Sequence, residues 1–487
     1  MRWSLALVAL SAGCTSRLLI GLPADITQTD SIVGMGTQGK SDVLFMVDNS
    51  PSMDAMQAEL RARFPQLIKT LSGLNQGGSL DLHIGVVTSD YGAGDTAGGG
   101  CEASPGGQKG LLQTVGAAAD ATCLPPLNAP YISYQVDALG NVTSNLPAGQ
   151  DVATTFTCMA SVGAGGCGFE HQLESVYAAL HNTNENSGFL RDDAALAVVF
   201  VTNEDDGSAP PDAKFYESAA DVSVFGAYDT FRQTRFAIEC SDKLPPYGND
   251  AVGTLSNCVG APQNVGLAYD ISRYINMFTQ PISAGGIKDD PSQIALLAIA
   301  APATPVTLAL VISGTGLGVP PNPTYEPCDA LGTGCVERLQ HSCQNSVDPA
   351  FFGDPAVRLD SVVNAATVHQ LWSICGDTED QAPDFTQAME GVGSEMALQA
   401  AGGCLPAALV TPDTPSCNIT IGDDPAVVSY CDAANTPPCW HIERDPTCPA
   451  RTDPNTGFAD TYRLVITGSA SVTGAVHAKC LTYQMAM

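Results

Sequence analysis

The chain contains short runs of consecutive apolar residues, separated by segments with the periodicity of amphipathic helices. The clearest runs are residues 42–47 (DVLFMV), 82–88 (LHIGVVT) and 194–201 (AALAVVFV). Strands of this composition are buried on both faces, which is typical of a parallel sheet covered by helices on each side. The alternation therefore predicts an α/β fold: a doubly wound, mostly parallel sheet flanked by helices.

Apolar residues at steps of three and four mark the helices of this pattern. We predict helices from Met53 to Leu71, from Phe169 to Leu180 and from Leu267 to Phe278. Because a proline inside a helix removes a backbone hydrogen bond, we expect Pro65 to kink or restart the first of them. Residues 91–165 are rich in glycine, proline and serine and are expected to be an excursion from the core.

A long apolar stretch from Gln293 to Ser313 has two interpretations, a membrane-spanning helix or a pair of strands. Pro302 and Pro305 interrupt it. Two buried strands joined by an Ala-Pro-Ala-Thr-Pro turn explain this pattern better than a spanning helix does.

The N-terminus has the features of an export signal. Arg2 precedes a short apolar core, Leu5 to Leu10, and a small-residue cleavage site that ends in Cys14. The apolar core is too short to span a bilayer of about 30 Å. The segment resembles a bacterial lipoprotein signal, in which the peptide is cut before the cysteine and the thiol is acylated. It departs from that pattern at Ser11, and an ordinary secretory signal is the alternative.

The cysteines agree with export. The chain has 17 cysteines, and assigning Cys14 to a lipid leaves an even number for disulfides, as expected in an oxidising compartment. Six of them follow residue 400, among many prolines and two predicted strands, 462–467 and 475–481. We therefore divide the chain into a signal peptide (1–13), a lipidated cysteine and tether (14–39), an α/β domain with Cys-rich insertions (40–400) and a small disulfide-rich β domain (401–487).

The charge of the chain excludes one class of partner. Its 20 basic and 51 acidic residues give a formal net charge of −31. Such a surface repels the phosphates of nucleic acids, so we expect no nucleic-acid partner.

A polar loop directly follows the first predicted strand. Asp48, Ser50 and Ser52 stand at alternating positions where the strand turns into a helix. One carboxylate and two hydroxyls on a small loop are the oxygen ligands that hard divalent cations such as Mg²⁺ prefer. Asp and Ser are also common helix N-caps, so the spacing is informative only because of its place after a buried strand.

In this context the segment DVLFMVDNSPSM resembles the first metal loop of the von Willebrand factor A family. LHIGVVTSD resembles the second strand, GAGGCGFEHQLESVYAAL the second metal loop with its helix, and AVVFVTNEDDGS the fourth strand with the third metal loop. The resemblance covers roughly residues 40–312 with large insertions, and extends to a closing helix near Phe385 to Gln399. It implies a domain of that fold with a divalent cation, Mg²⁺ or Ca²⁺, as cofactor.

The resemblance carries over residue by residue, with departures in two loops. Asp48, Ser50 and Ser52 match the first-loop ligands. In the second loop the family has Thr near Cys167 or Gly168, and Glu170 can replace it as a ligand or can serve as a favourable charge at a helix N-terminus. In the third loop Asn203 stands where the family has Asp, and carboxylates are close in sequence. The expected metal ligands are Asp48, Ser50, Ser52, Glu170, Asn203 and Asp205.

The resemblance implies a binding function rather than catalysis. In the family an acidic residue of a partner completes the metal coordination, so we expect an adhesion-type protein that binds a protein or cell-surface ligand. Cys14 would anchor it in the cell envelope, and Thr15, in place of the Asp that retains some lipoproteins in the inner membrane, favours the outer membrane or cell surface. Two alternatives are an envelope scaffold with a degenerate metal site and a secreted hydrolase with an unrecognised active site.

Overall fold

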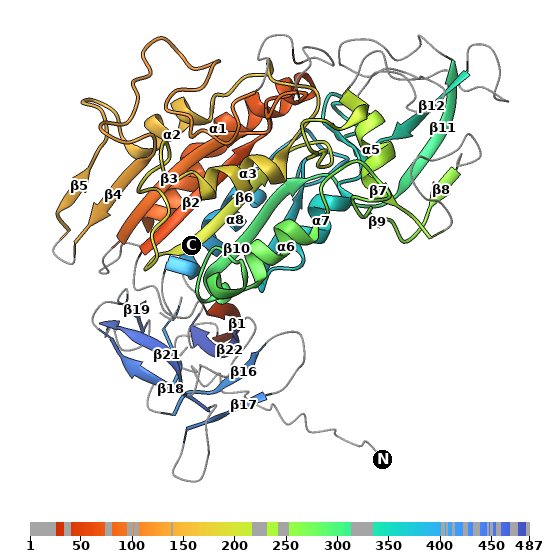
Figure 1. Cartoon of the computed structure of the whole chain (residues 1–487). Helices are drawn as coiled ribbons and strands as arrows, with labels where there is room; N and C mark the ends of the chain where they lie inside the picture. Colours follow the sequence, from red (N-terminus) through yellow and green to blue (C-terminus); the bar gives the residue numbers. More distant parts are fainter. Residues whose placement is uncertain are drawn as a thin grey trace, which may run out of the picture.

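The fold is that of a computed structural model, which describes residues 26–33, 40–73, 80–94, 101, 107–137, 140–216, 231–241, 253–312, 335–400, 405, 408–411, 414–421, 427–431, 439–445, 448, 451–453, 459–467 and 476–483. Figure 1 shows a large body of strands and helices, with a smaller group of strands beside it. The predicted signal peptide and the predicted lipidation site, Cys14, lie outside the described residues.

A seven-stranded sheet forms the centre of the large body, in the order β15-β10-β6-β2-β3-β4-β5. The neighbouring pairs from β15 to β3 are parallel, whereas β4 and β5 join one edge antiparallel. The prediction of a mostly parallel sheet is therefore confirmed. The strands are β2 (Lys40–Val47), β3 (Leu80–Thr88), β4 (Ile132–Val136), β5 (Val142–Ser144), β6 (Ala195–Val201), β10 (Ile294–Ala300) and β15 (Val368–Ser373).

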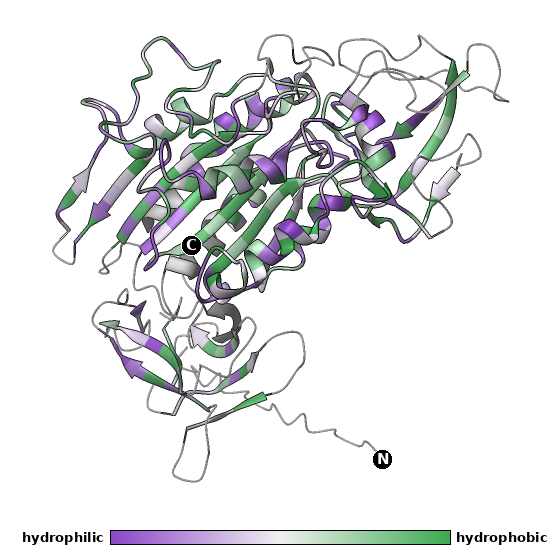
Figure 2. Ribbon diagram, viewed as in Figure 1, coloured by the Kyte–Doolittle hydropathy of each residue, from purple (hydrophilic) through white to green (hydrophobic). Residues whose placement is uncertain are grey.

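Helices cover both faces of this sheet, because successive side chains of each strand point to opposite faces. Val43, Phe45 and Val47 of β2 face one core, whose helices are α1 (Asp54–Gly73), α2 (Val152–Ala160) and α8 (Thr386–Ala400). Leu44 and Met46 face the other core, whose helices are α3 (Gln172–His181), α6 (Ser272–Thr279) and α7 (Val357–Val363). In Figure 2 the central strands are accordingly green, the colour of hydrophobic residues.

The helices and insertions differ from the expectation in two places. Helix α1 runs through Pro65 without a break, so the expected restart does not occur. Residues 91–165 supply β4, β5 and α2, and are thus part of the main sheet and its core rather than only an excursion. Only the two end residues of β4, a short strand near the sheet edge, are buried, which explains why no continuous apolar run marks it.

The apolar stretch 293–313 forms two strands, as predicted. Strand β10 lies in the central sheet, and β11 (Val306–Ile312) lies in a separate antiparallel sheet with β12 (Cys335–Gln340) and β8 (Gly253–Leu255). Within the described parts of the chain, no helix is long and apolar enough to cross a membrane.

The large body also contains shorter elements. They are α5 (Phe231–Ala237), the two-stranded pairs β7 (Ile238–Glu239) with β9 (Val259–Gly260) and β13 (Cys343–Gln344) with β14 (Phe352–Gly353), and single 3₁₀ turns at Pro51–Met53, Lys214–Tyr216, Ile282–Ala284 and Pro291–Gln293.

The C-terminal strands form a separate six-stranded sheet in the order β1-β22-β16-β17-β18-β21. Its first strand, β1, comes from residues 14–39, which the sequence analysis expected to be a tether, and pairs antiparallel with β22. Buried Leu405, Ile419, Trp440 and Leu464 form part of its small core. The strands are β1 (Ile26–Val33), β16 (Cys417–Ile421), β17 (Val427–Tyr430), β18 (Cys439–Arg444), β21 (Tyr462–Thr467) and β22 (Val476–Tyr483), with β19 (Arg451–Thr452) and β20 (Ala459–Asp460) as a separate pair.

Disulfides staple both parts of the molecule. In the large body they join Cys101 to Cys167, Cys123 to Cys158, Cys240 to Cys258 and Cys343 to Cys375. In the C-terminal sheet they join Cys417 to Cys480 and Cys431 to Cys439. Disulfides of this number are typical of proteins that mature in an oxidising compartment, which supports export.

Candidate metal centre

Asp48 stands at the carboxyl end of β2 and its side chain is fully buried. One carboxylate oxygen, Oδ1, accepts hydrogen bonds from the Ser50 backbone N–H and from the Ser89 hydroxyl, both at 2.8 Å. The other, Oδ2, accepts from the Thr202 hydroxyl at 2.7 Å. Since Ser89 follows β3 and Thr202 follows β6, Asp48 joins the ends of three neighbouring parallel strands.

The two serines of the first loop face the third loop. The hydroxyls of Ser50 and Ser52 lie 3.0 Å apart, and Ser52 donates to the Asn203 side-chain carbonyl oxygen at 2.9 Å. Asn203 is fully buried, and its side-chain nitrogen has no hydrogen-bond partner among the described residues. Three oxygen atoms from two loops are therefore gathered beside Asp48.

The second loop approaches the first through a glycine. The Gly166 N–H donates to the Asn49 carbonyl at 2.8 Å, and a Cβ on Gly166 would lie only 2.3 Å from the Asn49 side chain. A larger residue at this position would force the Asn49 side chain to move. The second loop continues to Glu170, which is fully buried just before α3. The backbone carbonyl of Glu170 accepts a hydrogen bond from the Gly207 N–H at 2.8 Å.

Glu204 brings a further carboxylate to the same place. Its side chain hydrogen-bonds to Ser52 and to Glu170, so two carboxyl groups lie against each other. Burial, followed by the charges of Asp354 and Asp48, raises the pKa of Glu204 well above its usual range. Two neighbouring carboxylates in a buried site cannot both stay ionised unless a cation or a shared proton compensates them.

Burial also raises the pKa of Asp48, although the hydrogen bonds from Thr202, Ser50 and Ser89 oppose this effect. The imidazole of His171, the residue after Glu170, does not offset the negative charge of the carboxylates. Burial lowers the pKa of His171 to about 4, so His171 is neutral at pH 7, and its Nε2 lies 2.9 Å from the Tyr216 hydroxyl. The loops therefore concentrate acidic groups around hydroxyl and amide oxygens.

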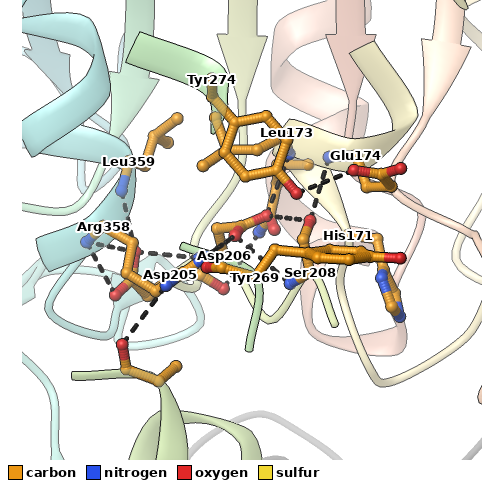
Figure 3. A network of polar contacts seen from close by, with 12 residues as sticks. His171, Leu173, Glu174, Asp205, Asp206, Ser208, Tyr269, Tyr274, Arg358 and Leu359 are labelled. Carbon is orange, nitrogen blue, oxygen red and sulfur yellow. Dashed lines mark hydrogen bonds and ion pairs between the residues drawn. The ribbon is translucent and has the colours of Figure 1, made fainter. Parts of the chain in front are cut away.

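Asp205, a predicted ligand, faces elsewhere. Its carboxylate accepts hydrogen bonds at 3.0–3.1 Å from the backbone N–H groups of Arg358 and Leu359, at the start of α7. Burial raises the pKa of Asp205 to about 7, against the effect of these bonds and of the Arg358 charge. Figure 3 shows this carboxylate directed at Arg358 and Leu359. The contacts of Asp205 are those of a helix cap and do not support a role as ligand.

Asp206 belongs to the same buried network. It forms an ion pair with Arg358 at 3.1 Å, and both side chains are completely buried. It also accepts from the Leu173 backbone N–H at 2.9 Å, while Ser208 accepts from that of Glu174 at 3.0 Å. The third loop thus holds the first turns of both α3 and α7.

The predicted residues Asp48, Ser50, Ser52, Glu170 and Asn203 lie on the three loops that meet at this edge of the sheet. Glu204 lies with them, whereas the neighbouring Asp205 faces the start of α7. Ser89 and Thr202 were not predicted from the sequence. Each directly follows a predicted strand, in the segments VVTSD and FVTNE, and this position at the carboxyl edge of a parallel sheet is the signal that finds them.

These residues fit a hard divalent cation. In the described part of the chain, no three His, Cys, Asp or Glu side chains form a metal site by themselves. A cation here would therefore depend on Ser50, Ser52 and the Asn203 carbonyl for most of its protein ligands, with Asp48 and Glu204 supplying charge. Mg²⁺ suits such a set, because it binds few carboxylates and keeps several waters.

No family model and no curated protein matches the chain. Among solved structures, the chain is similar to the pilus adhesin RrgA of Streptococcus pneumoniae at 10% identity and a TM-score of 0.20, over 94% of this chain and 58% of the adhesin. The chain thus spans less than two thirds of that protein, and at this TM-score the likeness carries no argument.

Proposed function

We propose that this protein is an envelope protein whose main domain has the von Willebrand factor A fold and binds a partner through a divalent cation. Asp48, Ser50 and Ser52 would hold the cation together with Asn203 and Glu204. An acidic side chain of a protein or cell-surface ligand would complete the coordination. Catalysis is not part of this function.

One observation carries the proposal: the loops that follow β2, precede α3 and follow β6 meet, and their oxygen atoms face one another. This is the arrangement that the resemblance requires of the three metal loops. The contact between Glu170 and Glu204 adds support, since two carboxyl groups against each other leave negative charge that a cation would compensate.

The mode of anchoring is a second part of the proposal. We infer that Cys14 carries the lipid and that the protein stands on the outer membrane or cell surface. The disulfides support an oxidising compartment outside the cytoplasm. Mass spectrometry of the protein from membranes tests the anchor, because acylation at Cys14 would add the mass of the lipid to the N-terminal peptide.

Thermal unfolding of the form without residues 1–14 tests the cation site. We expect Mg²⁺, Mn²⁺ or Ca²⁺ to raise the unfolding midpoint of the wild type relative to a chelator. A cation at a hundred times its dissociation constant stabilises the folded state by about 2.7 kcal/mol. Asp48→Ala removes the central carboxylate and should lose this shift, whereas Asp54→Ala, an exposed acidic residue on α1, should keep it.

A second candidate function is a scaffold with a degenerate metal site. It is favoured by the three hydrogen bonds that satisfy Asp48 without a cation. In that case neither the wild type nor Asp48→Ala would respond to cations, and Asp48→Ala would simply be less stable. Partner binding that survives a chelator would also support the scaffold.

A further inference from the structure

The β13–β14 hairpin packs directly against the third loop of the candidate metal centre. The Asp354 N–H, just after β14, donates to the Asn203 carbonyl at 2.8 Å. A Cβ on Gly353 would lie 2.5 Å from the Ala301 side chain and 3.2 Å from the Asn203 carbonyl oxygen, so the backbone approaches as closely as a glycine permits. The hairpin therefore forms one wall beside the metal loops.

This wall is held rigidly. The disulfide between Cys343 and Cys375 ties β13 to the residues after β15. Buried Asn345 donates from its side-chain nitrogen to the carbonyls of Cys375 and Gln381 at 3.0 and 2.9 Å. Side chains carried by the hairpin are consequently fixed relative to the sheet.

One pair on this wall has the chemistry of a recognition group. His341 Nδ1 lies 2.6 Å from the Asp354 carboxylate, and the ring packs against Phe352 at a centroid distance of 4.2 Å. In the tautomer that donates Nδ1–H to the Asp354 carboxylate, the lone pair of the ring is on Nε2. No described residue bonds Nε2, and both side chains are about one-fifth exposed, at 20% and 21%.

The charge of this pair also acts on the candidate metal centre. The charge of Asp354 is the strongest influence on the pKa of Glu204 after burial. Asp354 therefore holds the imidazole that it orients beside the third loop, next to Asn203.

We propose that His341 is a second contact for the partner: its Nε2 accepts a hydrogen bond from a main-chain N–H beside the acidic side chain that completes the metal centre. The inference rests on the proposed function. It narrows the ligand from any carboxylate to an exposed aspartyl segment whose neighbouring N–H is free, as in an extended strand or a loop. Asp354 acts as a positioning residue that sets the tautomer and the direction of the ring.

A matched pair of small probes tests this contact. One is the dimethylamide of N-acetyl-aspartic acid, which has a carboxylate and one N–H, and the other is its N-methylated analogue, which lacks that N–H. The protein is loaded with Mn²⁺, and the relaxation of water protons reports the displacement of water from the ion by each probe. Because one hydrogen bond changes affinity by about twofold to tenfold, we expect the N–H probe to bind better than its analogue by a factor in that range.

The variants assign the preference to His341. His341→Met should bind both probes equally, while His341→Gln, which keeps an acceptor, should retain part of the preference. His369→Met is the matched control, because the Nδ1 of His369 also lies in hydrogen-bond contact with an oxygen, 2.7 Å from the Ala366 carbonyl. His369 is at the N-terminal end of β15, whereas the β13–β14 hairpin is tied to the residues after its C-terminal end. Unfolding midpoints show that each variant is folded.

The outcomes are distinguishable. If the wild type binds Mn²⁺ but shows no preference for the N–H probe, or if His341→Met keeps that preference, the inference is overturned and the metal centre stands. If the wild type does not bind Mn²⁺ at all, the proposed function fails, and the contact fails with it.

Discussion

Residues 204–206 are three consecutive acidic side chains that serve three different parts of the molecule. Glu204 lies against Ser52 and Glu170, Asp205 caps α7, and Asp206 pairs with buried Arg358. Their separation follows from local geometry, since the chain bends at Asn203 and Glu204 and successive side chains point in different directions. Substitutions at the three positions should therefore have different consequences.

We expect Asp206→Asn to destabilise the protein by about 3–5 kcal/mol, because it leaves the Arg358 charge buried without its partner. Asp205→Asn should cost only about 1 kcal/mol, the usual value for a helix cap. Chemical unfolding measures both. Both variants should keep the cation-dependent shift that Glu204→Gln weakens. An equal loss of that shift in Asp205→Asn would show that Asp205 is a ligand after all.

Cation binding should depend on pH with a definite sign. The folded-state pKa values of Asp48 and Glu204 are raised above their unfolded values of about 4. At pH values between the unfolded and the folded pKa, the folded state holds more protons than the unfolded state. Without a cation, the free energy of unfolding that these two groups contribute therefore falls as pH rises. A divalent cation binds the ionised forms, and its stabilising effect should grow over the same range.

Unfolding midpoints at pH 5 to 8, with Mg²⁺ or with a chelator, measure this effect. The difference between the two series should widen with pH in the wild type and widen less in Glu204→Gln, which cannot titrate at that position. Other carboxyl groups change both series equally and cancel in the difference. A difference that stays constant from pH 5 to pH 8 would contradict the assignment.

The sequence located part of this centre because part of it is local. Asp48, Ser50 and Ser52 lie on one loop after one strand, and their spacing is visible without any tertiary information. The choice between Glu204 and Asp205 was not accessible in this way. It depends on the position in the fold of the α7 N-terminus, which is about 150 positions further along the chain. The free backbone N–H groups at that helix end bind one of the two adjacent carboxylates.

At the scale of elements, a disulfide links an insertion to the second loop of the centre. Cys101 and Cys167 are both buried, and Cys167 is three positions before Glu170. The bond closes a loop of 66 residues. It restricts the backbone that carries Glu170.

We therefore expect the double variant Cys101→Ala/Cys167→Ala to bind cations more weakly, in addition to an overall loss of stability of about 2–5 kcal/mol. Titration of Mn²⁺ against the folded variant separates the two effects. The control is Cys431→Ala/Cys439→Ala in the C-terminal sheet, which should lose stability there without a change in Mn²⁺ affinity. Equal affinities in both double variants would show that the bond is only a staple.

In the central sheet, the strands that the sequence predicted are those with nearly continuous burial. Strands β6 and β10 are apolar along their whole length and β2 from Val43 to Val47, because both faces are covered. Strands β4 and β15 lie toward the two edges of the sheet and are only partly buried. Without cover on both faces they carry polar residues and lose the apolar run, so they were missed.

At the scale of the whole molecule, the C-terminal sheet is not made by the C-terminal segment alone. Strand β1 comes from before the central sheet and β22 from near the other end of the chain, and they pair over eight positions, from Ile26 with Tyr483 to Val33 with Val476. No local pattern predicts this pairing, because the partners are separated by the entire α/β body. Without β1, β22 would become the edge of the sheet, with unpaired backbone groups.

Truncation before Lys40 should therefore damage the C-terminal sheet and spare the α/β body. We expect the protein that starts at Lys40 to be cut faster by protease within residues 405–483 and to self-associate through β22, while its cation-dependent shift is retained. A synthetic peptide of residues 26–33 added in trans should restore protection, and a scrambled peptide should not. If the truncated protein is as resistant and as monomeric as the protein that starts at residue 26, β1 does not complete the sheet, and residues 14–39 act as the tether that their composition predicts.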